Sequence, residues 1–170
     1  RSLNAAEGAV LLVDATQGIQ AQTLANLYLA LDANLEIIPV LNKIDLPAAQ
    51  PEKVASEICH LLGCDRSDIL AVSGKTGEGV DALLEKIIKV IPSPKINIDN
   101  PLRALIFDSV YDEYRGVIAY VRVFDGSIKA GDKIKFVANS GFADALEVGH
   151  FSPKFIKDAS LNSGEIGYIV

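Results

Sequence analysis

Residues 37–45 read IIPVLNKID, an apolar run that ends in a polar Asn-Lys-x-Asp motif. A short, continuous apolar run bounded by polar residues is typical of a buried strand in a parallel sheet. Residues 9–13 (AVLLV) lead into Asp14 in the same way, and residues 69–72 (ILAV) lead into Ser73. The sequence therefore predicts three buried strands, each followed by polar residues at its carboxyl end.

An amphipathic helix is predicted after each of these strands. Residues 21–32, 51–62 and 81–91 repeat apolar side chains at spacings of three and four. Pro51 suits the first turn of the second helix, and Gly63 suits its C-terminal cap. Three successive strand–helix units predict a parallel α/β sheet with right-handed crossovers. The side chains expected on the buried helix faces are Leu24, Leu27, Tyr28, Leu31, Val54, Ile58, Leu61, Leu62, Leu84, Ile87, Ile88 and Ile91.

The sequence changes character at residues 92–101, where Pro92, Pro94 and Pro101 predict an extended linker. Beyond this linker, β-rich segments alternate with glycine turns and carry no helical stripe, which predicts an all-β barrel or sandwich. We therefore expect one domain over residues 1–92 and a second over residues 93–170, cut short at its C-terminus. The expected strands lie within residues 102–107, 117–124, 133–137 and 166–170.

Composition indicates a globular protein, with 49% hydrophobic and 22% charged residues. The net charge of −6 argues against wholesale wrapping of nucleic acid. Residues 1–92 are the more acidic part, with a net charge of −5, so an RNA-facing surface is expected in residues 93–170, whose net charge is −1. No leader segment is visible, and no apolar run approaches the ~20 residues that cross a bilayer. We expect a cytoplasmic protein.

The two cysteines, Cys59 and Cys64, are too few for a disulfide framework and fit a reducing compartment. Their neighbour His60 raises the question of a metal site. No second cluster of ligands completes a four-ligand set, so we expect no metal here and interpret the cysteines as a thiol pair at a helix end.

Asn42, Lys43 and Asp45 are the strongest candidates for a binding site. They follow a buried strand at the carboxyl edge, where open α/β sheets bind ligands. Guanine presents two adjacent N–H donors that the Asp45 carboxylate can accept together, whereas adenine offers that carboxylate a ring lone pair. The stem of Lys43 can cover the base, and Asn42 can hold neighbouring loops in place. The alternative is a polar loop with solvated charges.

A second candidate loop follows the third strand: Ser73, Gly74 and Lys75 open a glycine-rich turn over residues 76–79. Its backbone N–H groups can meet guanine O6. A phosphate cradle is the competing interpretation, but the Gly-x4-Gly-Lys-[Ser/Thr] spacing is absent. A plain turn between a strand and a helix is the other alternative.

Together, Asn42-Lys43-Ile44-Asp45 and Ser73-Gly74-Lys75 resemble the two base-recognition motifs of the translational GTPases. Residues 1–23 resemble the segment that follows the second nucleotide switch in those factors. Residues 104–123 and 151–168 narrow the resemblance to the LepA branch, also called elongation factor 4. The resemblance implies the C-terminal half of a P-loop GTPase sheet followed by a translation-factor β-barrel, and it marks the chain as an internal fragment.

By this resemblance, the intact protein is a monomeric GTPase that binds GTP or GDP with Mg²⁺ and acts on ribosomes around translocation. The fragment carries no catalytic residues and is expected to be inactive alone, because hydrolysis needs a Walker-type loop and magnesium ligands that are not in this sequence. Its barrel is expected to contact small-subunit RNA and proteins. Peripheral membrane association also follows from the resemblance. The candidates for contact with RNA phosphates are Arg115, Arg122, Lys129, Lys133 and Lys135.

Three alternatives stay open at this point. The cations of the barrel can be a solvated rim with no RNA contact. The whole chain can be a docking module for RNA or protein that binds no nucleotide. A metabolic α/β enzyme with an added barrel fits poorly, because no set of acid, base and nucleophile converges in the sequence.

Overall fold

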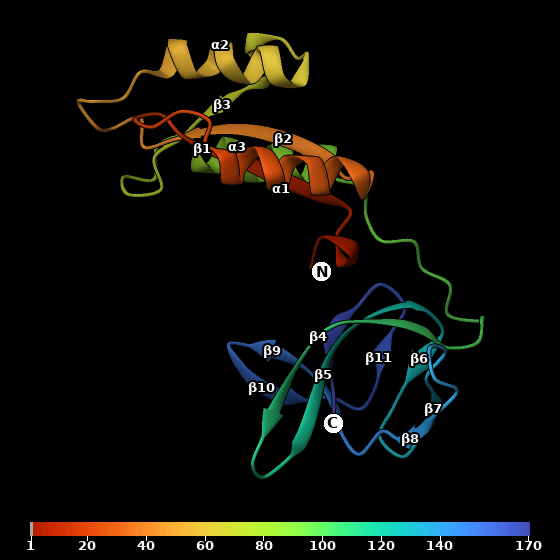
Figure 1. Ribbon diagram of the computed structural model, residues 1–170. Coiled ribbons are helices and arrows are strands. Elements are labelled where there is room, and N and C mark those ends of the chain that lie inside the picture. The colour runs from red at the N-terminus through yellow and green to blue at the C-terminus, as the bar shows by residue number, and fades with distance from the viewer. Residues whose placement is uncertain (1) are drawn as a thin grey trace. The chain divides into compact units, whose positions relative to one another are not determined.

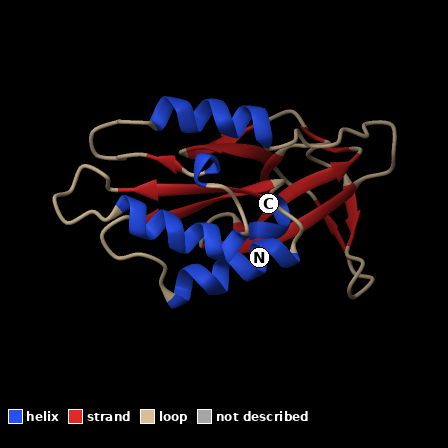
Figure 2. Cartoon of the chain, turned by 90° about the horizontal axis from the view of Figure 1, so that it is seen from above, coloured by secondary structure: helices blue, strands red, loops and turns tan. Residues whose placement is uncertain are grey.

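The computed structural model describes residues 2–170 (Figure 1). Arg1, the first residue of the lead-in segment on which the family resemblance draws, lies outside the described residues. Contacts within the chain divide it into two units, residues 6–93 and residues 94–170 together with residues 2–5. The first unit contains the long helices, which are the long blue ribbons of Figure 2, and the second is built of strands.

The first unit is a parallel sheet, as the sequence predicts, and its strand order is β1-β2-β3. Each strand is followed by a helix, and the neighbouring strands pair in parallel register. None of the helices in the described part of the chain is long and apolar enough to cross a membrane. The elements of this unit are β1 (Gly8–Asp14), α1 (Ala21–Asp32), β2 (Glu36–Asn42), α2 (Pro51–Leu62), η2 (Arg66–Asp68), β3 (Leu70–Ala71) and α3 (Val80–Val90). The short helix η1 (Ser2–Ala5) precedes them in the chain and groups with the second unit.

The side chains of β2 enter two small cores, one on each face of the sheet. Leu41 packs with Leu27 of α1 and Ile58 of α2, so these two helices cover one face. Ile38 and Val40 pack with α3 on the opposite face. Because the sheet is covered on both faces, its strands are continuous apolar runs rather than alternating ones.

The buried faces of α1 and α3 differ from those predicted. Tyr28 and Leu31 of α1 are exposed, and Leu27 is buried together with Ala30. Leu84 and Ile88 of α3 are exposed as well. Each helix carries two adjacent apolar stripes, and periodicity does not show which one meets the sheet. In α3 the stripe that packs on the sheet is Leu83, Ile87 and Ile91.

The second unit is an antiparallel β structure, which confirms the expected fold class of an α/β sheet followed by β strands. Its main sheet has the strand order β10-β9-β12-β5-β4, and β11-β6 and β7-β8 form two further pairs. The four predicted strands are present, with β4 and β5 longer than expected, and five short strands were not predicted. The strands are β4 (Arg103–Asp112), β5 (Gly116–Asp125), β6 (Ser127–Ile128), β7 (Lys133–Lys135), β8 (Phe142–Asp144), β9 (Val148–Ser152), β10 (Lys154–Lys157), β11 (Leu161–Asn162) and β12 (Ile166–Ile169).

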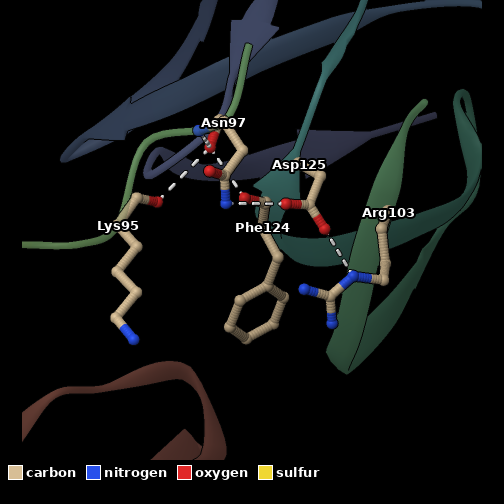
Figure 3. A network of polar contacts seen from close by, with 6 residues as sticks. Lys95, Asn97, Arg103, Phe124 and Asp125 are labelled. Atoms are coloured by element: carbon tan, nitrogen blue, oxygen red, sulfur yellow. Dashed lines mark hydrogen bonds and ion pairs between the residues drawn. The ribbon is translucent and has the colours of Figure 1, made fainter. Parts of the chain in front are cut away.

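Hydrogen bonds and one ion pair connect the linker to this second unit (Figure 3). The side chain of Asn97 donates to Asp125 Oδ1 at 2.9 Å, and its backbone N–H donates to Ser163 Oγ at 2.9 Å. Arg103 Nε pairs with Asp125 Oδ2 at 2.5 Å. The Arg103 guanidinium, followed by hydrogen bonds from asparagine side chains, holds the pKa of Asp125 below its usual value. The linker is therefore held at residue 97 by β5 and by the turn after β11.

Candidate functional site

The polar residues after β1, β2 and β3 gather at the carboxyl edge of the sheet. Asp14 is the register partner of Asn42, so the last residues of β1 and β2 stand side by side. The backbone N–H of Ile44 donates to Val72 O, which brings the loop after β2 against the end of β3. This is the edge at which parallel α/β sheets bind their ligands.

Asp45 is held by Ser73 across the two loops. Ser73 Oγ donates to Asp45 Oδ1 at 2.7 Å, and the same oxygen accepts the backbone N–H of Thr76 at 3.1 Å. The Ser73 side chain is fully buried, so its hydroxyl is fixed by both partners. Asp45 is only partly buried, and one hydrogen bond leaves its carboxylate with further acceptor positions. The carboxylate is therefore oriented before a ligand arrives.

Asn42 joins the same two loops at a second point. Its Oδ1 accepts the backbone N–H of Gly74 at 3.1 Å. Both motifs predicted from the sequence are therefore brought together: Asn42 and Asp45 each bond to the loop that begins at Ser73. Lys75, the last of the predicted site residues, lies exposed in that loop.

Lys43 has a backbone φ of +65°, in the left-handed region that side-chain-bearing residues seldom adopt. Such a conformation costs about 1–2 kcal/mol and concentrates at ligand sites. Its Nζ forms an ion pair with Asp14 Oδ2 at 2.6 Å. The pair anchors the end of a long side chain whose stem is then free to lie over a flat ligand.

Asp14 is the most strongly perturbed acid of this edge. Lys43 and then Thr16 hydrogen-bond to it and lower its pKa to about 2. Thr16 contributes both its backbone N–H, at 2.8 Å, and its hydroxyl, at 2.7 Å, to Asp14 Oδ1. Asp14 is therefore ionised throughout the physiological range and provides Lys43 with a permanent partner.

The sequence interpretation assigned no site role to Asp14 or Thr16. The available signal was position, because Asp14 ends β1 at the edge where Asn42 ends β2. The sequence does not reveal the left-handed backbone at Lys43 or the ion pair between its ammonium group and Asp14.

The site provides the oriented Asp45 carboxylate and the alkyl stem of Lys43, whose ammonium is held by Asp14. Together these groups suit a planar base with adjacent N–H donors. No group of three or more His, Cys, Asp or Glu side chains within residues 2–170 could hold a metal ion. Cys59 and Cys64 are free thiols, and the Nδ1–H of His60 donates to Ser56 O at 2.9 Å.

The five cations proposed for RNA contact differ in their surroundings. Lys129, Lys133 and Lys135 are exposed on and beside β7. Arg115 is exposed, pairs with Glu147 at 3.2 Å and lies over the Phe155 ring.

Arg122 does not fit the expectation of a phosphate contact. Its guanidinium stacks over the Phe124 ring at 4.6 Å, and the residue is only 6% exposed. Burial also lowers the pKa of Arg122. The reason is its place in β5, a central strand of the main sheet, where neighbouring strands and Phe124 cover it.

The family model described as the elongation factor Tu GTP binding domain matches residues 1–93. A second model, elongation factor G domain 2, matches residues 101–150. The first match covers more than half of the chain, so the chain belongs to the elongation factor Tu GTP-binding domain family.

Curated relatives narrow this class and agree with the resemblance predicted from the sequence. Elongation factor 4 of Thermobifida fusca is 60% identical over 170 residues, and elongation factor 4 of Pseudarthrobacter chlorophenolicus is 58% identical. Both alignments cover 100% of this chain and 28% of the relative. The chain thus spans little more than a quarter of the proteins that it matches.

Solved structures support the fold. The apo form of translation elongation factor SelB from Methanococcus maripaludis superposes with a TM-score of 0.78 at 20% identity, over 98% of this chain and 36% of that one. The same factor in complex with the GTP analogue GPPNHP gives a TM-score of 0.76 at 21% identity, over 99% of this chain and 38% of that one. At this level of identity the likeness concerns the fold alone.

Proposed function

We propose that residues 1–92 are the base-reading half of a GTP-binding domain and that residues 93–170 are the following barrel domain of a ribosome-associated translation factor. The observation that carries the proposal is the Asp45 carboxylate, held by the buried Ser73 at the carboxyl edge of the sheet. Membership of the elongation factor Tu GTP-binding domain family and relatives named elongation factor 4 support it.

In this proposal Asp45 accepts the N1–H and 2-amino groups of guanine together. Two charge-assisted hydrogen bonds to one carboxylate give both energy and geometric selectivity. Adenine would place a ring lone pair against the same charge and leave it desolvated without a donor. Lys43 covers the base with its stem. The backbone N–H groups of Ser73 and Gly74 already donate to Glu78 O and Asn42 Oδ1, so we assign the contact with guanine O6 to the backbone N–H of Lys75.

Phosphate and Mg²⁺ binding belongs to another part of the intact protein. Within residues 2–170 no group of three or more His, Cys, Asp or Glu side chains could hold a metal ion, and the Walker-type loop that hydrolysis requires is not part of this sequence. The chain alone is therefore expected to bind nucleotide weakly and not to hydrolyse it, whereas the intact protein is a GTPase that uses GTP, GDP and Mg²⁺.

The barrel is proposed to contact the RNA and proteins of the small ribosomal subunit through Arg115, Lys129, Lys133 and Lys135. These side chains are exposed, and phosphate contact requires cations that reach the RNA backbone. Arg122 is left out because it is buried. We place the intact protein in the cytoplasm as a monomer. Peripheral association with the cytoplasmic face of the membrane rests on the family resemblance alone.

Binding measurements on the intact protein test this function. Fluorescent GDP should bind and be displaced by GTP but not by equal concentrations of ATP, and ribosomes should accelerate GTP hydrolysis. Retained ribosome binding with no guanine-nucleotide binding would contradict the proposal and favour a docking module.

The barrel contacts need a separate test, which is the salt dependence of ribosome affinity. Replacing Lys133 and Lys135 by glutamine should lower the affinity and flatten its salt dependence, because fewer counterions are then released. The matched control is Lys53→Gln with Lys89→Gln, two exposed lysines of the first unit. Equal behaviour of the two pairs would contradict the contact.

A further inference from the structure

Two thiols meet at the C-terminal end of α2. Gly63 ends the helix in the left-handed conformation, with a φ of +68°, and its backbone N–H donates to Cys59 O at 2.8 Å. In caps of this kind, the residue after the glycine turns back toward the last helical turn, and a side-chain contact often accompanies it. Here Cys64 is the residue after the glycine, and Cys59 begins the last turn.

The surroundings of the two sulfur atoms agree with this contact. Burial raises the pKa of the Cys64 thiol, and the adjacent Cys59 thiol raises it further through its charge and a hydrogen bond. Both side chains are partly buried and pack against the same core as Val54 and Ile58. The thiols are thus held beside each other by a structured cap rather than by chance encounter of flexible side chains.

A small thiol reagent can reach the Cys64 member of this pair. Cys64 lines an open cavity of about 470 Å³ at the amino edge of the sheet, together with Pro39, Leu62 and Lys86. This cavity lies away from the loops that hold Asp45 and Ser73, which follow the carboxyl ends of the strands. Chemistry at the thiols is therefore separate from nucleotide binding.

We propose that Cys59 and Cys64 are a reversible oxidation site that closes to an intramolecular disulfide in exchange with a small disulfide such as glutathione disulfide. One protein thiolate attacks the reagent to form a mixed disulfide and release one glutathione thiolate. The second protein thiolate attacks the mixed disulfide, forms the Cys59–Cys64 bond and releases the second glutathione. The protein gives up two electrons and two protons, which leave with two reduced glutathione molecules.

In the oxidised form, the Cys59–Cys64 disulfide cross-links the last turn of α2 to the segment that leads through η2 to β3. In reducing cytosol such pairs are transient and act as sensors rather than as permanent supports. The disulfide is expected to make local opening of this turn less favourable, because a cross-link lowers the conformational entropy of the open states.

Peptide mapping of the intact protein tests the proposal. Cleavage after Lys53 and Arg66 places both cysteines in the single tryptic peptide of residues 54–66. After exposure to glutathione disulfide and alkylation, this peptide should lose two hydrogen masses, take up no alkyl group and recover on reduction. Cys59→Ser and Cys64→Ser should each stop at the glutathione adduct. An adduct or two alkylated thiols in the wild-type peptide, with no internal disulfide, would overturn the proposal.

A comparison with the isolated peptide 54–66 tests whether the cap is responsible. The folded protein should form the disulfide at a ratio of oxidised to reduced glutathione about tenfold lower than the peptide requires, because the cap raises the effective concentration of one thiol at the other. Gly63→Ala should diminish this advantage, because alanine is strained at a φ of +68°. If the folded protein needed an equal or higher ratio of oxidised to reduced glutathione than the peptide, the cap would not promote the disulfide, and the contact between the two cysteines would serve packing only.

Discussion

Replacing Ser73 by alanine removes the hydroxyl that joins the two loops proposed to recognise the base. The hydroxyl is fully buried, donates to the Asp45 carboxylate at 2.7 Å and accepts the Thr76 N–H at 3.1 Å. Loss of a hydrogen bond to a charged group, with a buried donor left unpaired, costs about 1–3 kcal/mol. Because these bonds join protein groups only, most of this cost should appear as lower folding stability.

The effect of Ser73→Ala on affinity should be smaller than its effect on stability. The Asp45 carboxylate must then be ordered when the base binds, and ordering one side chain costs about 0.5–1.5 kcal/mol. This corresponds to about a two- to tenfold weaker Kd for GDP. Titration of fluorescent GDP and urea unfolding of the same intact protein measure the two quantities.

The control for Ser73→Ala is Ser56→Ala, which makes the same change on the exposed surface of α2. It should leave both the Kd for GDP and the unfolding midpoint near their wild-type values. If Ser73→Ala matched Ser56→Ala in both measurements, the view that Ser73 orients the base-reading carboxylate would be refuted.

Three further predictions concern stability. Asp14 has a folded pKa of about 2 against an ordinary 3.8, so its ion pair stabilises the fold above about pH 4 and is lost as the pH falls toward 2. Asp14→Asn should therefore unfold about 1 kcal/mol more easily at pH 7, and urea titrations should show the gap closing between pH 4 and 2. Gly79→Ala should destabilise more than Gly77→Ala in thermal unfolding, because both glycines have positive φ but a methyl group at Gly79 alone would overlap Ala71 O; equal losses would contradict this. Asp125→Ala should lower the melting temperature of the chain more than Arg103→Ala, because the aspartate is buried and also holds Asn97; the reverse order would contradict the network.

The succession of strands and helices along the first unit can be predicted from the sequence, because each strand is a continuous apolar run with a turn signal at its end. Which face of α1 and of α3 is buried cannot be predicted in this way. Ile88 is as apolar as Ile87, yet Ile88 is 83% exposed whereas Ile87 packs on the sheet. Helical periodicity gives a stripe, and only tertiary packing selects between two adjacent stripes.

The short strands of the second unit lie beyond sequence-based prediction for a different reason. Strands β6, β8 and β11 have two or three residues each, too few to show alternation. Pairing across the unit defines them, as Leu161 pairs with Ile128, and such partners are distant in sequence. Residues 133–135 formed a recognisable strand because a β-branched residue stands between two polar ones.

The sequence could predict that the residues proposed to read the base lie together, because topology places the ends of parallel strands at one edge of the sheet. Asn42 ends β2 and Ser73 follows the neighbouring strand β3, so the loops after the two strands lie side by side. The ion pair between Lys43 and Asp14 could not be foreseen, since it depends on a left-handed backbone at a lysine. That conformation is rare, and no local sequence preference indicates it.

The base specificity of Asp45→Asn in the intact protein shows whether the Asp45 carboxylate reads the base. Asparagine replaces one acceptor by an N–H donor, which suits the 2-oxo group of xanthine and no longer suits the 2-amino group of guanine. We expect Asp45→Asn to weaken GTP binding at least about a hundredfold and to gain binding of xanthosine triphosphate, since bonds to a charged group contribute about 1.5–3 kcal/mol each. Unchanged GTP binding with no gain for xanthosine triphosphate would show that Asp45 does not read the base.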